Sequence, residues 1–205
     1  MYGFTNIELK VFKELTTPEK IQDWLEKLPI NFELKGETCR SPRRVLKEHK
    51  AHCIEGAMLA AVALRMLGFK PLVIDLKAAR HDDDHVVAVF KQHGLWGAIS
   101  KVNHNVLRFR DPVYRDIREL VMSFFHEYFT QDRKKTLRSY SLPVNLARFD
   151  HKGWMTSEKD LWYIAEYIDQ VKHYPIASAS RIRTYRKVDP IEIRAGNLER
   201  WPDPR

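Results

Sequence analysis

Three residues whose types can together carry out nucleophilic catalysis follow one another along the chain: a cysteine, a histidine and an acid. Cys53 stands at the predicted first turn of an apolar helix, His85 begins a β-like run, and Asp111 precedes Pro112. A helix N-terminus favours the thiolate form of a cysteine, and its free N–H groups can bind a developing oxyanion. A histidine can transfer the proton and an acid can orient the ring. The pattern therefore predicts a Cys-His-Asp nucleophilic site.

A helix and an antiparallel sheet are the elements expected to position these residues. Apolar residues from Cys53 onward follow helical spacing, and Gly68 is a natural end for that helix. Short apolar runs follow at 72–76, 86–90 and 95–99, the last two joined by a hairpin-like turn at 91–94. This order indicates an α+β fold, with the cysteine-bearing helix packed on the sheet.

Further elements are expected around this core. Thr17 and Pro18 predict a helix that runs to about residue 25, and apolar stripes predict helices at 114–129 and 157–171. Residues 106–109 fit a further strand, and 181–185 fit an edge strand with one basic face. Prolines in the tail from residue 173 favour extended or loop structure there.

Four stretches resemble the transglutaminase-like superfamily of papain-fold cysteine enzymes. The family patterns G-x-C, L-R-x-x-G, H-A-W-x-E-V and W-x-x-x-D-P correspond here to Ala51-His52-Cys53, Leu64-Arg65-Met66-Leu67-Gly68-Phe69, His85-Val86-Val87-Ala88-Val89-Phe90 and Trp96-Gly97-Ala98-Ile99-Ser100. The resemblance extends from Cys53 to Asp111. It implies one transglutaminase-like α+β domain over residues 1–205, with a papain-like core at about 40–130 and a C-terminal extension at about 150–205.

The resemblance also implies an activity, cysteine-dependent acyl transfer. Cys53 would form a thioester with the acyl group, and His85 would act as general base and acid. Water as the acceptor makes the protein a peptidase or amidase, and an amine makes it a transglutaminase. The substrate would be a peptide, a protein or a small amide. The alternative is a catalytically silent member of the same fold that serves as a protein-binding module.

Two residues are candidates for the third member of the catalytic site. Asp111 has the Asp-Pro context of the family but lies one strand later than the family's acid. Asn103 lies closer to the expected place, and an amide can also orient a histidine. The family's acid ends the strand that begins at Trp96, where this chain has Ser100 instead.

The amino-acid composition limits the classes of protein to which the chain can belong. The 205 residues are 44% hydrophobic and 30% charged, as in a globular domain, and no apolar run approaches the roughly 18 residues of a membrane span. The first residues do not read as a signal peptide, so we expect no membrane association and a cytoplasmic location. Basic and acidic residues are interleaved despite the net charge of +8, and no nucleic-acid motif accompanies them. We therefore expect no nucleic-acid partner.

Two further features bear on cofactors and redox state. Residues 81–85 hold two histidines and three aspartates, but consecutive side chains in a loop rarely converge on one ion. This favours a solvated acidic loop, so we expect neither a metal nor a cofactor. Cys39 and Cys53 do not make a disulfide framework, and we expect both to be thiols.

Overall fold

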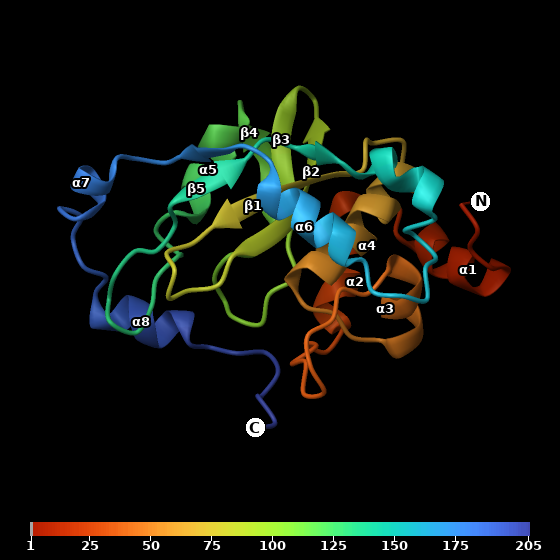
Figure 1. The fold of residues 1–205 in the computed structure, drawn as a ribbon, viewed down its shortest axis with the longest axis horizontal. Coiled ribbons are helices and arrows are strands. Elements are labelled where there is room, and N and C mark those ends of the chain that lie inside the picture. Colours follow the sequence, from red (N-terminus) through yellow and green to blue (C-terminus); the bar gives the residue numbers. More distant parts are fainter. Residues whose placement is uncertain (1) are drawn as a thin grey trace.

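The chain folds around a seven-stranded antiparallel sheet that carries helices on both faces (Figure 1). The computed structural model describes residues 2–205. Across the sheet the order is β4-β3-β2-β1-β5-β7, with β6 paired to β1. The strands are β1 (Leu72–Lys77), β2 (His85–Gln92), β3 (Leu95–Ile99), β4 (Arg110–Tyr114), β5 (Ser139–Ser141), β6 (Val144–Asn145) and β7 (His173–Pro175). The expected α+β class, with an antiparallel sheet, is confirmed.

Four of the described helices precede the sheet in sequence, and the others follow its first four strands. None of those between residues 2 and 205 has the length and apolar character needed to cross a membrane. They are α1 (Asn6–Glu14), α2 (Pro18–Lys27), α3 (Pro42–Glu48), α4 (Cys53–Met66), α5 (Ile117–Phe124), the 3-10 helix η1 (Leu146–Lys152), α6 (Trp162–Gln170), α7 (Ala179–Ile182) and α8 (Pro190–Gly196).

Helix α4 begins at Cys53 and lies inside the apolar core. Every residue from Glu55 to Leu64 is buried, and the helix packs mainly against β2. Gly56 allows α4 to lie close to the segment that follows β3, because a Cβ at that position would clash with the Cβ of Lys101. Gly68, with φ of +90°, follows the end of the helix in the left-handed conformation that glycine adopts without strain.

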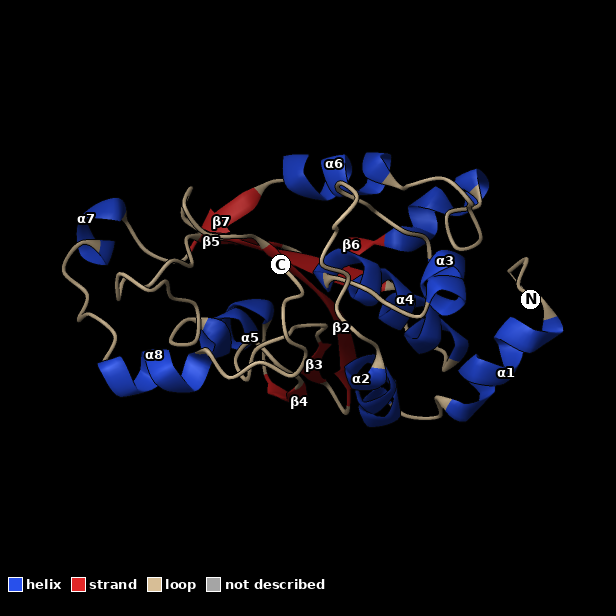
Figure 2. Cartoon of the chain, turned by 90° about the horizontal axis from the view of Figure 1, so that it is seen from below, coloured by secondary structure: helices blue, strands red, loops and turns tan. Residues whose placement is uncertain are grey.

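Alternating side chains of β1 and β2 build one apolar core on each face of the sheet. Val73, Val86 and Ala88 belong to the core that includes α4, while Ile74 and Val87 belong to the core that includes α5. Figure 2 shows the sheet nearly edge-on, with α2, α3 and α4 on one side and α5 on the other. Because side chains alternate along a strand, the odd-numbered positions of β1 face the cysteine helix.

The elements nearest the cysteine match the sequence prediction. The strands expected at 72–76, 86–90 and 95–99 are β1, β2 and β3; β1 and β2 are slightly longer than expected, and β3 has the expected bounds. His93 and Gly94 form the hairpin between β2 and β3, both with positive φ. Thr17 caps α2 by accepting a hydrogen bond from the backbone N–H of Lys20.

Other elements differ from those predicted from the sequence. Residues 106–109 are not a strand, and β4 begins at Arg110 instead. The helix expected at 114–129 is the shorter α5, because Tyr114 ends β4 and Asp116 caps the helix through the N–H of Glu119 at 2.8 Å. The helix expected from residue 157 begins at Trp162.

The basic segment 181–185 also differs from the expected edge strand. Its first residues belong to α7, and Ser178 caps that helix by accepting a hydrogen bond from the N–H of Arg181. An alternating pattern five residues long is too short to exclude a single helical turn, and the serine cap decides in favour of the helix.

Candidate active site

Cys53 is the first residue of α4, and its side chain is partly exposed. In the part of the chain that the structure describes, the backbone N–H groups of Cys53 and Ile54 donate to no protein acceptor, as is usual in a first helical turn. Such N–H groups carry the positive end of the helix dipole. The thiol therefore lies where a negative charge on sulfur, or on an oxygen bound to it, is stabilised.

His85 is the first residue of β2, and its ring is buried. Nε2 of this ring lies 2.8 Å from Oγ of Ser100. The Ser100 hydroxyl donates its single proton to the carbonyl oxygen of Leu107 at 2.6 Å. It must therefore accept from His85, so Nε2 of His85 carries a proton. This leaves Nδ1 as the nitrogen that is free to exchange a proton with the thiol.

The electrostatic environment of Cys53 favours the thiolate. Burial raises the pKa of this thiol, but hydrogen bonds with His52 and His85 and the charges of both rings outweigh it and lower the pKa to about 5. A cysteine with such a pKa is ionised at neutral pH and is a competent nucleophile.

The second cysteine has the opposite environment. Cys39 is fully buried and free, and burial together with the nearby carboxylate of Glu55 raises its pKa to about 12. A neutral, inaccessible thiol is a packing residue. Of the two cysteines, only Cys53 is suited to chemistry.

His52 is the N-cap residue of α4 and the second histidine beside the thiol. Its Nε2 lies 2.9 Å from the carbonyl oxygen of Thr38, 3.4 Å from Oε1 of Glu55 and 3.5 Å from Oε1 of Glu33. Burial opposes a charge on this ring, but hydrogen bonds with Cys53 and Glu55 raise its pKa to about 11.

Glu55 is a fully buried carboxylate two residues beyond Cys53, in the first turn of α4. Its oxygens accept from the backbone N–H groups of Arg40 at 3.0 Å and His52 at 3.1 Å, and from the Thr38 hydroxyl at 2.8 Å. The Asn31 amide donates a further bond at 3.2 Å. Burial raises its pKa, but its bonds with His52 and these donors lower the pKa to about 2.

The structure does not bring either expected third residue to His85. Asp111 is exposed on β4. Asn103 uses its amide elsewhere: its Nδ2 donates to the carbonyl oxygen of Trp201 at 2.9 Å, and its Oδ1 accepts from the Trp201 N–H at 3.0 Å. Among residues 2–205, neither side chain hydrogen-bonds the ring of His85, and Ser100 occupies that place.

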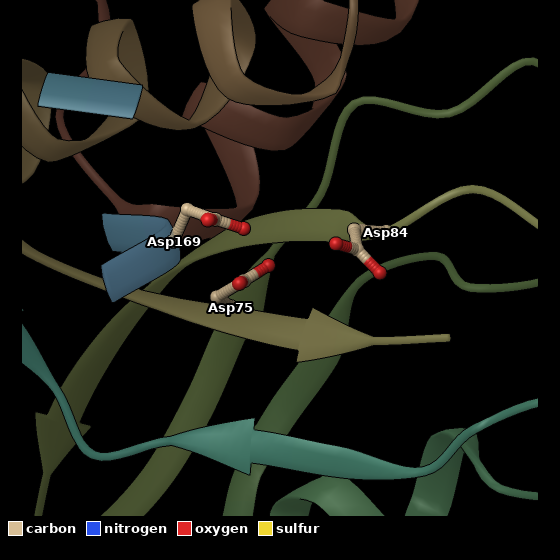
Figure 3. Close-up of side chains that lie close together, drawn as sticks. All are labelled: Asp75, Asp84 and Asp169. Atoms are coloured by element: carbon tan, nitrogen blue, oxygen red, sulfur yellow. The ribbon is translucent and has the colours of Figure 1, made fainter. Parts of the chain in front are cut away.

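A cavity of about 360 Å³ opens beside the thiol, lined by Cys53, Asp75, Lys77, Asp84, Glu166 and Asp169 among others. Figure 3 shows that Asp75 of β1, Asp84 before β2 and Asp169 of α6 turn their carboxylates toward one another. Lys77 lies among them, with Nζ 2.7 Å from Asp84, 3.6 Å from Asp75 and paired with Asp169. These three carboxylates thus share a cation that the chain itself provides.

The acidic loop at 81–85 does not gather its side chains at one point. Asp84 binds Lys77, Asp82 accepts from the Thr136 hydroxyl, and His85 turns to Ser100. His85 also lines a second cavity of about 550 Å³, and Asp84 lines both cavities. Cys53 thus lines one cavity and His85 lines the other.

Sequence reasoning missed three contributors to this site. The sequence shows Ser100 only as the residue in place of the family's acid. That position in the chain was nevertheless the signal that its side chain contacts His85. His52 directly precedes Cys53 and Glu55 follows it by two residues, and a glutamate three residues after an N-cap is the pattern of a capping box. That pattern indicates a contact between Glu55 and the N–H of His52, but not the contacts of the ring.

No protein-family model matches this chain, and neither does any curated protein.

Proposed function

We propose that the protein is a cysteine-dependent acyl-transfer enzyme with a transglutaminase-like, papain-type core, and that hydrolysis of a peptide or amide is its main reaction. The observation that carries this proposal is the environment of Cys53. A thiol with its pKa lowered to about 5 lies at a helix N-terminus, beside His85 and on the wall of an open cavity. Perturbed nucleophiles in cavities are concentrated at functional sites.

The arrangement of elements supports the papain-type assignment. The cysteine opens a buried helix that packs on the central strands of an antiparallel sheet, and the histidine opens the strand against which that helix packs. Ser100, at the position of the family's acid, contacts the histidine on the nitrogen that faces away from the thiol. The spatial order Cys53, His85, Ser100 thus reproduces the family's order of parts with a hydroxyl in the third place.

The proposed chemistry follows from these groups. The Cys53 thiolate forms a bond to the carbonyl carbon of an amide, and the negative charge that develops on the carbonyl oxygen is stabilised by the N–H groups at the start of α4. As the C–N bond breaks, protonated His85 gives its proton to the departing amine and leaves a thioester on sulfur. Water then attacks the thioester, neutral His85 accepts a proton from it, and the C–S bond breaks to release the acid.

An acyl-enzyme experiment tests this proposal without knowledge of the natural substrate. The purified protein is mixed with p-nitrophenyl acetate, and nitrophenol release and the mass of the Cys53 peptide are followed together. We expect a burst of nitrophenol and one acetyl group on Cys53. Cys53→Ala should lose both, and Cys39→Ala should keep both. Absence of the acetyl group from Cys53 would contradict the proposal.

One observation favours the second candidate function, a silent protein-binding module. The ring of His85 is oriented by a neutral hydroxyl, and a carboxylate is the stronger partner for an imidazolium. A silent module predicts no burst and no acetylated Cys53 in a folded protein.

A further inference from the structure

The ring of His52 is held by oxygen atoms that can only accept. On its Nε2 side lie the Thr38 carbonyl oxygen at 2.9 Å and the carboxylates of Glu55 at 3.4 Å and Glu33 at 3.5 Å. Nε2 therefore carries a proton. Two carboxylates at this distance also favour the doubly protonated, positively charged ring.

The carboxylate of Glu55 is fixed in its charged form. It is fully buried, and donors from Asn31, Thr38, Arg40 and His52 surround its two oxygens. The nearest other cation is the guanidinium of Arg40, whose Nη1 lies 3.7 Å from Glu55 but whose Nε lies 2.8 Å from Glu48. Arg40 is thus shared with another acid, and the negative charge that faces His52 is not cancelled.

His85 has no such counter-charge. The partner of its Nε2 is the neutral hydroxyl of Ser100, which itself donates to a carbonyl oxygen. In the described chain no carboxylate pairs with this ring. The two histidines beside Cys53 therefore differ in kind: one is bound to fixed negative charges and the other to a neutral group.

We propose that these histidines divide the work of the site: His52, held by Glu55 and Glu33, is a positioning residue that stays positively charged and maintains the Cys53 thiolate, while His85 transfers protons. The role of His85 rests on the proposed acyl-transfer function, whereas the role of His52 concerns the thiol alone. The raised pKa of His52, about 11, and the lowered pKa of Cys53, about 5, support the assignment.

This division has a chemical consequence. In a simple cysteine–histidine ion pair, loss of the proton from the histidine also removes the cation that stabilises the thiolate. With His52 charged throughout, the thiolate persists after His85 becomes neutral. His85 can then act as a base toward water while the leaving sulfur is still stabilised by a neighbouring cation.

The test is the rate of Cys53 alkylation by iodoacetamide against pH, measured by peptide mass spectrometry in His52→Gln, His85→Asn and the control His151→Gln, an exposed histidine in η1. The expected result is a rise of about two units in the apparent pKa of Cys53 in His52→Gln, and a rate about tenfold lower at about pH 6. His85→Asn should lose less of the rate than His52→Gln at that pH, and His151→Gln should match the unaltered protein.

An unchanged rate in His52→Gln, or a loss in His85→Asn at least as large, would overturn the proposal. Circular dichroism of each variant confirms that it is folded. If His52→Gln does not fold, Glu33→Gln, at a partly exposed position, takes its place and should also raise the apparent pKa of Cys53. Alkylation needs no turnover, so a protein that forms no acyl-enzyme can still pass or fail this test.

Discussion

Oγ of Ser100 lies 2.8 Å from Nε2 of His85 and donates a hydrogen bond to the carbonyl oxygen of Leu107. This contact fixes which nitrogen of His85 carries a proton and turns the other toward Cys53. The backbone of Ser100 is held in turn by the side chain of Gln22, which bonds both its N–H and its carbonyl oxygen at 2.9 Å. A residue of α2 thus supports the orientation of the histidine.

Removal of this hydroxyl should weaken catalysis without abolishing it. In Ser100→Ala the His85 ring loses one hydrogen bond, of about 1 kcal/mol, so we expect the acylation rate to fall about fivefold. Stopped-flow nitrophenol release measures that rate, with the exposed Ser180→Ala as the control. A rate equal to that of the control would show that Ser100 does not orient the ring.

Loss of His85 itself should have a larger effect. We expect His85→Ala to abolish turnover, as Cys53→Ala does, because His85 is the residue that transfers the proton to the leaving amine in the proposed reaction. Both variants should keep the far-ultraviolet circular dichroism of the unaltered protein. Full turnover in either folded variant would contradict the assignment of these residues.

Asp111 should not take part in the reaction. It is exposed on β4, so Asp111→Ala should leave the acylation rate unchanged within about twofold, as is usual for surface positions. The measurement is the same stopped-flow assay. A large loss of rate would restore Asp111 as the third member of the site.

Asn103 should act on the C-terminal segment instead. Its side-chain amide holds the backbone of Trp201, while its backbone carbonyl oxygen accepts from the Arg200 N–H at 3.0 Å. Because only the side-chain bonds are lost in Asn103→Ala, we expect faster hydrogen exchange at Trp201 and an unchanged rate of Cys53 alkylation. Slower alkylation with unchanged exchange would be the opposite of this expectation.

The local elements could be predicted from sequence, and the contacts between distant ones could not. The apolar periodicity of α4 and the short runs of β1, β2 and β3 reflect burial of neighbouring residues, which sequence patterns record directly. The pairing of Ser100 with His85 depends on the register between β2 and β3. The choice between Asp111 and Asn103 likewise needed the positions of β4 and of the C-terminal segment.

His52 illustrates the same limit. As a residue beside the cysteine it could be noted from sequence, but its charge depends on Glu33 and Thr38, which lie in a loop well before it in the chain. By contrast, the free thiol at a helix start was evident, because the helix dipole acts on the residues of its own first turn.

Glu55 should be important for stability as well as for charge. Its pKa is lowered from 4.5 to about 2, so the stability it contributes is present above about pH 4.5 and is lost as the pH falls toward 2. Removal of one partner from a buried ionic network is costly, and we expect Glu55→Gln to lower the free energy of unfolding by about 3 kcal/mol.

Urea denaturation at neutral pH measures this change, with Glu14→Gln as the matched control because Glu14 is exposed. The difference between the two variants should shrink toward pH 2, where the carboxylate of the unaltered protein is itself neutralised. Equal stability of Glu55→Gln and the control at neutral pH would contradict the network described above.

The central claim is that Cys53 is a thiolate at neutral pH, and the most direct measurement is its alkylation rate against pH in the unaltered protein. Peptide mass spectrometry separates it from Cys39, whose pKa of about 12 makes it an internal reference that should remain unreactive. We predict a half-maximal rate near pH 5 for Cys53. A half-maximal rate near pH 9, the ordinary value for a thiol, would show that the surrounding histidines do not activate it and would contradict the account.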